Sequence, residues 1–344
     1  MRRASFLSIV ALVVPVVAAC GGVASTGLPS NAATTTTSPA PAATTLATPA
    51  SSVAYAPIPR TSASMTWDPA SHTILMYGGD AAGGPSNAMD AWDGSAWLKR
   101  TVAGPRSRDD GVFIADPSRG VVVLSGGRSG QTVLSDTWEW DGAAWHDVTS
   151  AGPIPRAHAA AAYDPVSKRM ILYGGVTEGG TQYDTWSWDG TAWEALDTKG
   201  IPGRVVNYMA WDPTLQQLLV LAVDLSVASA DQLYPSELWG WTGSAWTLVA
   251  DGGPRFSPLQ RFVEGPAHPF LIDGGALQNA FSTYEWTGSA WTRLEGEAPP
   301  VRNGQAAAWD PVRKQLVMFG GFNGNTVYGD TWLLDGGVWR QVGP

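Results

Sequence analysis

The stretch Asp141-Gly142-Ala143-Ala144-Trp145 decides the fold of this chain, because close variants of it occur at five further positions. Each variant has Asp or Thr, then Gly, two further residues and a closing Trp. The closing tryptophans are Trp97, Trp145, Trp193, Trp246, Trp291 and Trp339, and the intervals between them are 48, 48, 53, 45 and 48 residues. A fixed period of this length is typical of repeat architectures. The sequence therefore predicts six repeated units.

Two further signals recur in each unit. An arginine precedes an Asp-Pro pair by eight residues, as Arg156 precedes Asp164-Pro165, and a Gly pair such as Gly174-Gly175 follows nine residues after the Pro. The arginines that open the six units are Arg60, Arg108, Arg156, Arg204, Arg255 and Arg302. Such a set of evenly spaced turn signals favours several short strands in each unit.

The third unit illustrates the local structure that we expect. Residues 156–163 form a first strand that ends at Asp-Pro, because Pro cannot donate to a strand ladder and restricts its predecessor. Residues 169–173 form a second strand, residues 185–188 a third, and a fourth begins near Trp193 after an Asp-Gly hairpin turn. Four antiparallel strands in each of six units predict an all-β fold, namely a six-bladed β-propeller.

These residues resemble the kelch family, and within it the propeller of the galactose oxidase type. The resemblance rests on the Gly pair after the second strand and on the aromatic residue and Trp that follow, and it covers residues 57–344. Three units depart from the pattern: Ala222-Val223 replace the Gly pair of the fourth, Glu264-Gly265-Pro266 replace Asp-Pro in the fifth, and Asp90 stands where later units have Trp. Ring closure is expected either from packing of the first unit on the sixth or from residues before Arg60 that join the last blade.

The N-terminal segment has the features of a secretory signal. Arg2 and Arg3 precede an apolar run over residues 4–19 that is too short for a membrane span. The sequence Val17-Ala18-Ala19-Cys20 resembles a bacterial lipobox, which implies cleavage before Cys20 and a lipid on its sulfur; an ordinary signal peptide is the alternative. We therefore expect a signal over residues 1–19 and a protein anchored to the outer side of a bacterial cell membrane.

Residues 20–57 form a second segment, which is rich in Ala, Thr, Ser and Pro and cannot build a core. They predict a disordered tether, and residues 58–344 then form the propeller. The formal net charge of −9 and the lack of a basic run argue against nucleic acid as a partner. Since Cys20 is the one cysteine, no internal disulfide is possible, and packing alone must hold the propeller, which we expect to be a monomer.

The residues offer little support for catalysis. A galactose oxidase cofactor would need a tyrosine cross-linked to a cysteine and two histidine ligands, and the four histidines fall at different phases of different units. No pair of them has metal-ligand spacing, so we predict no copper, no other metal and no cofactor. Most carboxylates belong to the repeated turns, where Asp bonds its own backbone. The histidines in question are His72, His146, His158 and His268.

The six unit-opening arginines have two interpretations. The kelch resemblance implies that the first strand is innermost, so these arginines would surround one mouth of the channel and bind a carboxylate or phosphate by paired hydrogen bonds. Alternatively, each arginine ties neighbouring blades together through the acids Asp136, Asp184, Glu237 and Asp330.

Residues that break the phase of the repeat are the other candidates. The fourth unit has the longest loop between its second and third strands, with Asp224, Asp231 and Tyr234. Binding residues concentrate on loops held by a rigid scaffold, so these three residues form a candidate binding loop. A solvated turn without a ligand is the alternative.

Three classes of function remain open from the sequence. The first is a non-catalytic binding module at the cell surface for a protein or a glycan, which we favour. The second is a carbohydrate-active enzyme, either an oxidase or a glycosidase, and the third is a structural component of the envelope. Fold alone does not decide among them.

Overall fold

The computed structural model describes residues 55–343 apart from 199, 225–233, 256–259 and 276–279. The described residues all belong to one compact unit, Ser52–Pro344. The expected signal, Cys20 and most of the expected tether therefore fall outside the described part of the chain. Among the described residues, no helix is long and apolar enough to cross a membrane.

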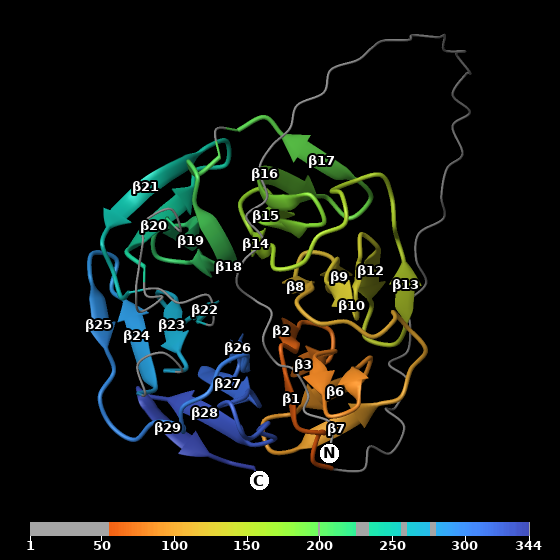
Figure 1. Cartoon of the computed structure of the whole chain (residues 1–344), viewed down its shortest axis with the longest axis vertical. Coiled ribbons are helices and arrows are strands. Elements are labelled where there is room, and N and C mark those ends of the chain that lie inside the picture. The colour runs from red at the N-terminus through yellow and green to blue at the C-terminus, as the bar shows by residue number, and fades with distance from the viewer. Residues whose placement is uncertain (1–54, 199, 225–233, 256–259, 276–279, 344) are drawn as a thin grey trace. The chain divides into compact units, whose positions relative to one another are not determined.

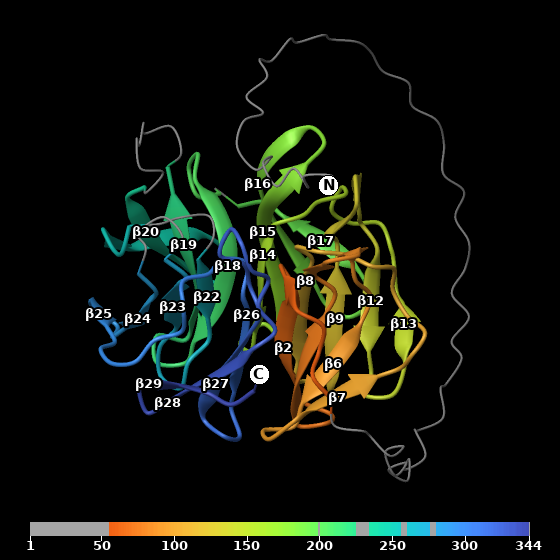
Figure 2. The ribbon, with the colours of Figure 1, turned by 60° about the horizontal axis from the view of Figure 1, so that its bottom comes forward.

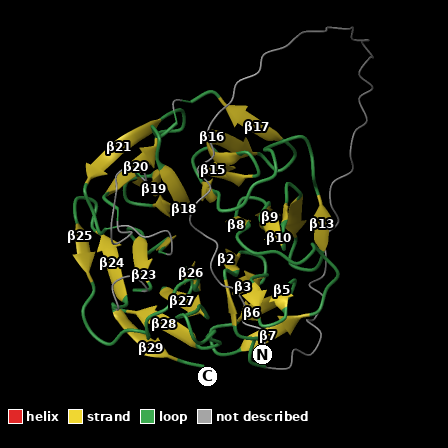
Figure 3. Cartoon of the chain, in the orientation of Figure 1, coloured by secondary structure: helices red, strands yellow, loops and turns green. Residues whose placement is uncertain are grey.

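The unit Ser52–Pro344 is built from antiparallel sheets, as Figure 3 shows. In its described residues six sheets have four strands each, and each sheet comes from one continuous stretch of chain. Sheet 1 has β2 (Ser64–Asp68), β3 (Thr73–Tyr77), β6 (Met89–Trp92) and β7 (Trp97–Arg100); sheet 2 has β8 (Val112–Asp116), β9 (Val121–Ser125), β12 (Thr137–Trp140) and β13 (Trp145–Asp147); sheet 3 has β14 (Ala160–Asp164), β15 (Arg169–Thr177), β16 (Gly180–Trp188) and β17 (Trp193–Leu196).

The second three sheets repeat this order of strands. Sheet 4 has β18 (Val205–Asp212), β19 (Gln217–Val223), β20 (Ser236–Trp241) and β21 (Trp246–Asp251); sheet 5 has β22 (Arg261–Val263), β23 (Phe270–Asp273), β24 (Ser282–Trp286) and β25 (Trp291–Arg293); sheet 6 has β26 (Ala306–Asp310), β27 (Gln315–Phe319), β28 (Thr331–Asp335) and β29 (Val338–Gln341). Five two-residue strands extend the loops: β1 (Arg60–Thr61), β4 (Asp80–Ala81), β5 (Gly84–Pro85), β10 (Arg128–Ser129) and β11 (Thr132–Val133).

The first strands of the six sheets contact one another in a closed cycle. β2 contacts β8, β8 contacts β14, and the series continues through β18, β22 and β26 back to β2. Figures 1 and 2 show the sheets of this unit around a common centre, with the first strands innermost. The all-β expectation is confirmed, and this arrangement of four-stranded sheets is compatible with a propeller.

The repeated Asp-Gly phrase forms the turn between the third and fourth strands. In sheet 3, Asp189 Oδ1 accepts hydrogen bonds from the main-chain N–H groups of Thr191 at 2.8 Å and Ala192 at 2.9 Å. Gly190 has φ 98°, a conformation that favours glycine. Where Thr replaces Asp, its hydroxyl accepts from one N–H group, as Thr242 does from Ala245 at 3.2 Å. The phrase is therefore a structural turn that delivers Trp to the fourth strand.

The Asp-Pro pairs form the turn between the first and second strands in a similar way. Asp164 Oδ1 accepts from the N–H of Val166 at 2.9 Å, and Asp310 Oδ1 accepts from Val312 at 3.0 Å. Both aspartates are buried. The prediction that these carboxylates bond their own backbone is confirmed at both turns.

The Gly pair allows one unit to approach the next. Gly127 N–H donates to the Arg156 carbonyl at 2.9 Å, and Gly321 N–H donates to the Arg60 carbonyl at 3.0 Å. A Cβ at Gly126, which has φ 62°, would lie 2.7 Å from the Arg156 carbonyl oxygen. In sheet 4, where Ala222-Val223 replace the pair, β19 continues through both residues and pairs with Val205 and Val206 at the start of β18.

Two expected strand boundaries need correction. The first strand of the third unit begins at Ala160 and not at Arg156. In residues 156–159, Ala157 forms a bridge to Val176 of the same unit, while the N–H groups of Arg156 and His158 donate to the preceding unit. The second strand does not end before Gly174-Gly175: β15 passes through both with a register shift between Tyr173 and Gly175 and pairs onward with β16.

Apolar cores fill every boundary between neighbouring sheets. The boundary between sheets 2 and 3 contains Val123, Leu172 and Trp193, and equivalent clusters lie at the other five boundaries of the described unit. Several closing tryptophans reach the preceding sheet: Trp193 Nε1–H donates to Thr137 Oγ1 at 3.0 Å and Trp246 Nε1–H to Thr185 Oγ1 at 3.1 Å. Burial and this bond together join neighbouring sheets.

Closure of the ring uses the same contacts as the other boundaries. Ile74 and Trp97 of sheet 1 share a buried cluster with Val317 and Phe319 of sheet 6. Trp97 Nε1–H donates to Thr331 Oγ1 at 2.8 Å. Of the two expected routes to closure, packing of the first unit on the sixth is the one that the described residues use; Tyr55 packs against the same cluster without adding a strand to sheet 6.

Candidate functional site

The unit-opening arginines are engaged by carboxylates of their own sheets. Arg108 donates to Asp136 at 2.8 Å from Nη1 and 2.7 Å from Nη2, and also from Nη1 to the Gly126 carbonyl at 2.9 Å. Arg156 pairs with Asp184, and Arg302 with Asp330, in the same geometry. Arg60, Arg108, Arg156 and Arg302 are buried.

The main chain of these arginines contacts the neighbouring sheet. The Arg108 carbonyl accepts from Gly79 N–H of the preceding unit at 2.9 Å, while its guanidinium bonds within its own unit. The proposed tie between blades through Asp136, Asp184, Glu237 and Asp330 therefore needs correction. The ion pair lies inside one unit, and the bond between units comes from the peptide group.

The first unit has its acid at a different position. Asp90 is fully buried and pairs with Nη2 of Arg60, two residues further along the chain than in the other units. Burial raises the pKa of Asp90 to about 7 and lowers the pKa of Arg60 to about 10. Asp90, which replaces the expected Trp, thus supplies the carboxylate partner of Arg60. The regular spacing between arginine and acid in the other units does not predict this partner.

The fourth and fifth units differ from this pattern. Arg204 is a quarter exposed and bonds both Glu237, at 2.9 Å, and Asp224, at 2.9 Å. Arg255 is exposed. An anion-binding mouth made by the six arginines stays a prediction, and the described geometry gives five of them carboxylate partners.

The expected binding loop is described only at its ends. Asp224 bonds Arg204, and Tyr234 packs in part against the core between sheets 4 and 5. Asp231 lies outside the described residues. The loop therefore stays a candidate without a described surface.

The histidines are separated in the structure as well. His146 Nε2 lies 2.7 Å from Asp141 Oδ2, His268 Nδ1 lies 2.8 Å from Asp212 Oδ2, and His158 Nε2 lies 3.5 Å from Asp110 Oδ2. His72 packs edge-on against Trp67. Among the described residues, no group of three His, Cys, Asp or Glu side chains is placed to hold a metal ion.

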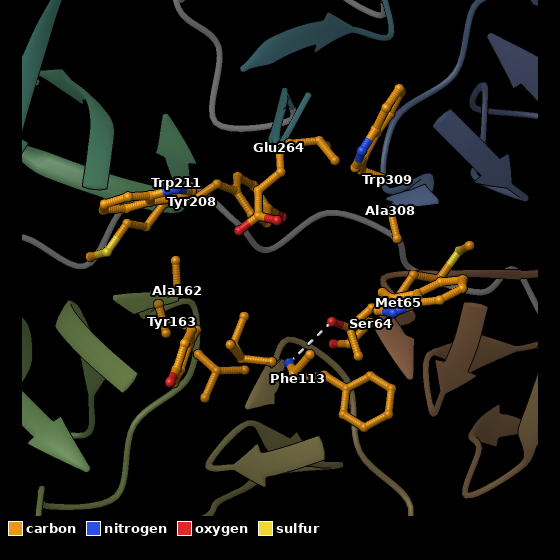
Figure 4. A pocket seen from close by; sticks show the side chains of 18 of the residues that line it. Ser64, Met65, Phe113, Ala162, Tyr163, Tyr208, Trp211, Glu264, Ala308 and Trp309 are labelled. Carbon is orange, nitrogen blue, oxygen red and sulfur yellow. Dashed lines mark hydrogen bonds between the residues drawn. The ribbon is translucent and has the colours of Figure 1, made fainter. Parts of the chain in front are cut away.

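A cavity of about 710 Å³ lies between the six innermost strands. Residues of β2, β8, β14, β18, β22 and β26 line it, and Figure 4 shows several of their side chains around the open space. This volume is in the range of small-ligand sites. The sequence indicated Glu264 only as a departure from the repeat, and it did not indicate Arg261.

Aromatic side chains line one end of the cavity. Each directly precedes the Asp of an Asp-Pro turn, and each is half-buried. Three of them also contribute to the cores between sheets: Trp67 between sheets 1 and 6, Trp211 between sheets 3 and 4, and Trp309 between sheets 5 and 6. Their exposed faces form an apolar rim in the cavity. The four residues are Trp67, Tyr163, Trp211 and Trp309.

Sheet 5 places two charged residues in the cavity. Arg261 on β22 is buried, and Glu264 follows the end of the same strand with its side chain open to solvent in the cavity. Although solvent reaches Glu264 through the cavity, the protein that surrounds the cavity removes part of its hydration. This raises the pKa of the Glu264 carboxyl to about 7, while a hydrogen bond from the Trp211 main-chain N–H acts to lower it. Figure 4 shows Glu264 directed into the space between Trp211 and Trp309.

β18 and β22 together form a wall with two levels. Arg261 lies over the Tyr208 ring, 4.5 Å from its centroid, and three residues further along both strands Glu264 meets Trp211. Three residues span about 10 Å along a strand. The only signal for this wall in the sequence was the broken phase of the fifth unit. It places Arg261 at a position that the other units fill with apolar residues, and Glu264 in place of the Asp of the Asp-Pro pair.

A comparison with known protein families finds no matching family, and a search of curated proteins finds no relative. The function must therefore be argued from the cavity itself.

Proposed function

We propose that this chain is a six-bladed propeller of the kelch type that acts as a non-catalytic binding module, with a glycan segment held in the cavity between the innermost strands. The cycle of six four-stranded sheets supports the propeller assignment. The single observation that carries the binding role is the wall of β18 and β22, where Arg261 pairs with Tyr208 and Glu264 with Trp211. No other pair of neighbouring first strands described here has this combination of charge and aromatic surface.

The form of the cavity favours a glycan over a folded protein partner. A space of about 710 Å³ between strands admits a few sugar rings. Trp211 and Trp309 offer flat apolar faces to the C–H faces of a sugar, and charged groups beside them offer hydrogen bonds to its hydroxyls. A convex protein surface would meet only the mouth.

A glycosidase is the second candidate, because a carboxyl group with a raised pKa suits a general acid. Such enzymes need two carboxyl groups about 5–10 Å apart. Asp110 is the other carboxylate that lines the cavity, and it precedes β8, whereas Glu264 follows β22. All first strands run in the same direction around the cycle, so the two lie near opposite ends, about 20 Å apart along the strands. This separation favours binding without hydrolysis.

The expected location of the protein remains part of this proposal. A lipid on Cys20 and a tether over residues 20–57 would hold the binding unit outside the cell membrane. The Cys20→Ala variant of the full chain is expected to leave the membrane fraction after a high-salt wash. A variant that stays with the membrane would contradict the anchor without affecting the cavity.

Titration of the full chain with chitotriose, cellotriose and trigalacturonate tests the binding role. At least one of these trisaccharides is expected to change the tryptophan fluorescence. Trp309→Ala should weaken that binding about tenfold or more, because a stacking face is lost. Tyr183→Ala, an exposed aromatic on β16, is the matched control and should bind normally. Lack of binding to all three probes contradicts the glycan proposal, and release of shorter sugars contradicts the non-catalytic one.

A further inference from the structure

Arg261 is a buried cation at a position that the other five sheets fill with apolar residues. Arg261 pairs with Ile272 of the second strand, two residues before a Gly pair. In the other five sheets, the first-strand residue that pairs with the equivalent second-strand position is Met65, Phe113, Ala161, Met209 or Ala307. Only 8% of Arg261 is exposed. The repeat itself therefore does not need an arginine here.

The surroundings of Arg261 provide hydrogen-bond acceptors for only some of the N–H donors of its guanidinium. Nε–H donates to the Gln305 carbonyl at 2.6 Å, and the group lies over the Tyr208 ring. Arg60, Arg108, Arg156 and Arg302 are buried as well, and each has a carboxylate partner. Arg261 is the one buried arginine among the described residues without an ion pair, although the charge of Asp110 acts on it at longer range.

An unpaired buried charge costs stability, and proteins retain it where a ligand completes the pair. Arg261 is part of the cavity lining, and its Nη1 and Nη2 groups form no hydrogen bond within the described residues. These two groups present the fork that binds a carboxylate through two parallel hydrogen bonds.

We infer that Arg261 binds the carboxylate of an acidic sugar, a uronate, in the cavity. This inference rests on the proposed function and names its ligand class. The carboxylate would bind the two Nη groups, and the sugar ring would lie along the Tyr208 and Trp211 side of the wall. A sugar further along the same glycan then reaches the level of Glu264, about 10 Å further along the strand.

Besides the tyrosines Tyr163 and Tyr208, four other charged or titratable groups share this cavity, namely Asp110, His158, Lys168 and Glu264. Asp110 lies 3.5 Å from His158 Nε2 and 3.4 Å from Arg128 Nη2, so its repulsion of an incoming carboxylate is partly balanced. Glu264 belongs to the other level of the wall. Arg261 is thus the cation best placed to receive the anion.

The variant Arg261→Met separates ligand binding from folding, because Met65 and Met209 already occupy the same register in sheets 1 and 4. Without ligand, we expect its melting temperature to equal or exceed that of the wild type, since an unpaired charge is removed. Arg261→Lys keeps the charge without the planar fork and should retain binding weakened about tenfold. Arg340→Met, on the exposed face of β29, is the control for loss of one positive charge.

Calorimetric titration of the full chain at constant ionic strength measures the effect. Trigalacturonate and galactotriose differ only in their carboxyl groups, and acetate supplies a carboxylate without a sugar ring. The wild type and Arg340→Met are expected to bind trigalacturonate at least about 30-fold more tightly than galactotriose. Arg261→Met should lose this preference.

Three outcomes would overturn the inference or separate it from the proposed function. Equal affinity for the two trisaccharides, or a preference retained by Arg261→Met, overturns it while glycan binding stands. A ligand-free Arg261→Met that melts several degrees lower, with Arg261→Lys unchanged, shows a structural role and also overturns it. Acetate binding that needs Arg261, without any sugar binding that needs Trp309, supports the anion site and contradicts the glycan function.

Discussion

Sheets 2, 3 and 6 follow the repeat closely, whereas sheets 4 and 5 depart from it. In the regular sheets a buried arginine bonds a carboxylate of its own unit, and in sheets 2 and 6 the Gly pair hydrogen-bonds the carbonyl of the next unit's arginine. In sheet 4 the arginine is a quarter exposed with two acids, and in sheet 5 charged residues enter the inner strand and its end. The arginine–carboxylate pairs and Gly pairs that repeat build the ring, whereas Arg261 and Glu264, which break the repeat, line the cavity.

This difference explains why residues that recur in every unit, such as the unit-opening arginines, are poor indicators of a binding site. A residue that occurs at the same phase of every unit serves an interface that every unit must form. A ligand bound in the central cavity would occupy it once, so the residues that recognised it would have no reason to repeat. Arg261 and Glu264 fit that description better than the six unit-opening arginines do.

The largest expected effect is the loss of stability when a closing tryptophan is replaced, and this loss should differ between the regular sheets and sheet 5. Trp193→Ala should lower the free energy of unfolding by about 4 kcal/mol, since Trp193 is buried against Trp188 and bonds Thr137. Trp291→Ala in sheet 5 should cost about 2 kcal/mol, because Trp291 is half-buried and its indole N–H has no partner in the described residues. Denaturant titration measures both, and equal losses would remove the contrast.

The arginine–carboxylate pairs provide the next contrast. Arg108→Ala should lower the free energy of unfolding by about 3 kcal/mol, because Asp136 and the Gly126 carbonyl both lose a partner. Arg204→Ala should cost about 1 kcal/mol or less, because solvent reaches both sides of its pair. Thermal unfolding of the two variants at neutral pH tests this order, and a larger loss for Arg204→Ala would reverse it.

The Gly pair offers a smaller effect. Gly126→Ala should cost about 2 kcal/mol, because the new Cβ would meet the Arg156 carbonyl and the residue has φ 62°. Gly130→Ala has nearly the same φ, 60°, but open space around the new Cβ, so about 1 kcal/mol is expected. Denaturant midpoints compare the two, and identical shifts would mean that the contact between units contributes nothing.

Glu264 gives the smallest effect, with a defined pH dependence. Its pKa is raised from 4.5 to about 7 in the folded state, so the folded state binds more protons in that window and stability falls as pH rises through it. Glu264→Gln removes this loss and should be more stable than the wild type at pH 8, by about 1 kcal/mol or less because the cavity holds solvent. At pH 4 the two should melt alike, and a gap of similar size at both pH values would contradict the linkage.

Much of the fold follows from local signals in the sequence. The Asp189 and Asp164 turns depend on side chains that bond the next two residues, so short patterns suffice to place them. The burial of Trp193 could be predicted because it is a large apolar residue that recurs at the same position of each repeat. The number of units and the strand order within each unit could therefore be predicted, although the first strand of the third unit begins four residues later than expected.

The candidate site could be predicted only in part. The partner of Arg60 was overlooked because Asp90 reaches it from another position along the strand. The equivalence of Arg261 with Met65 and Met209 depends on the register of strand pairing. The fifth unit lacks the Asp-Pro motif from which positions are counted in the other units, so the sequence alone does not reveal this equivalence. Register and the inward direction of side chains are tertiary properties.

The closure of sheet 1 on sheet 6 has a consequence for the synthesis of the chain. Ile74 and Trp97 are made early, yet the residues that cover them, among them Val317 and Phe319, are made about 240 positions later. Until then sheet 1 presents an uncovered apolar face, and contacts between such distant segments form slowly. The nascent polypeptide thus exposes an aggregation-prone apolar surface on sheet 1 through most of translation. A chaperone that shields this surface would be needed until the sixth repeat has been synthesised.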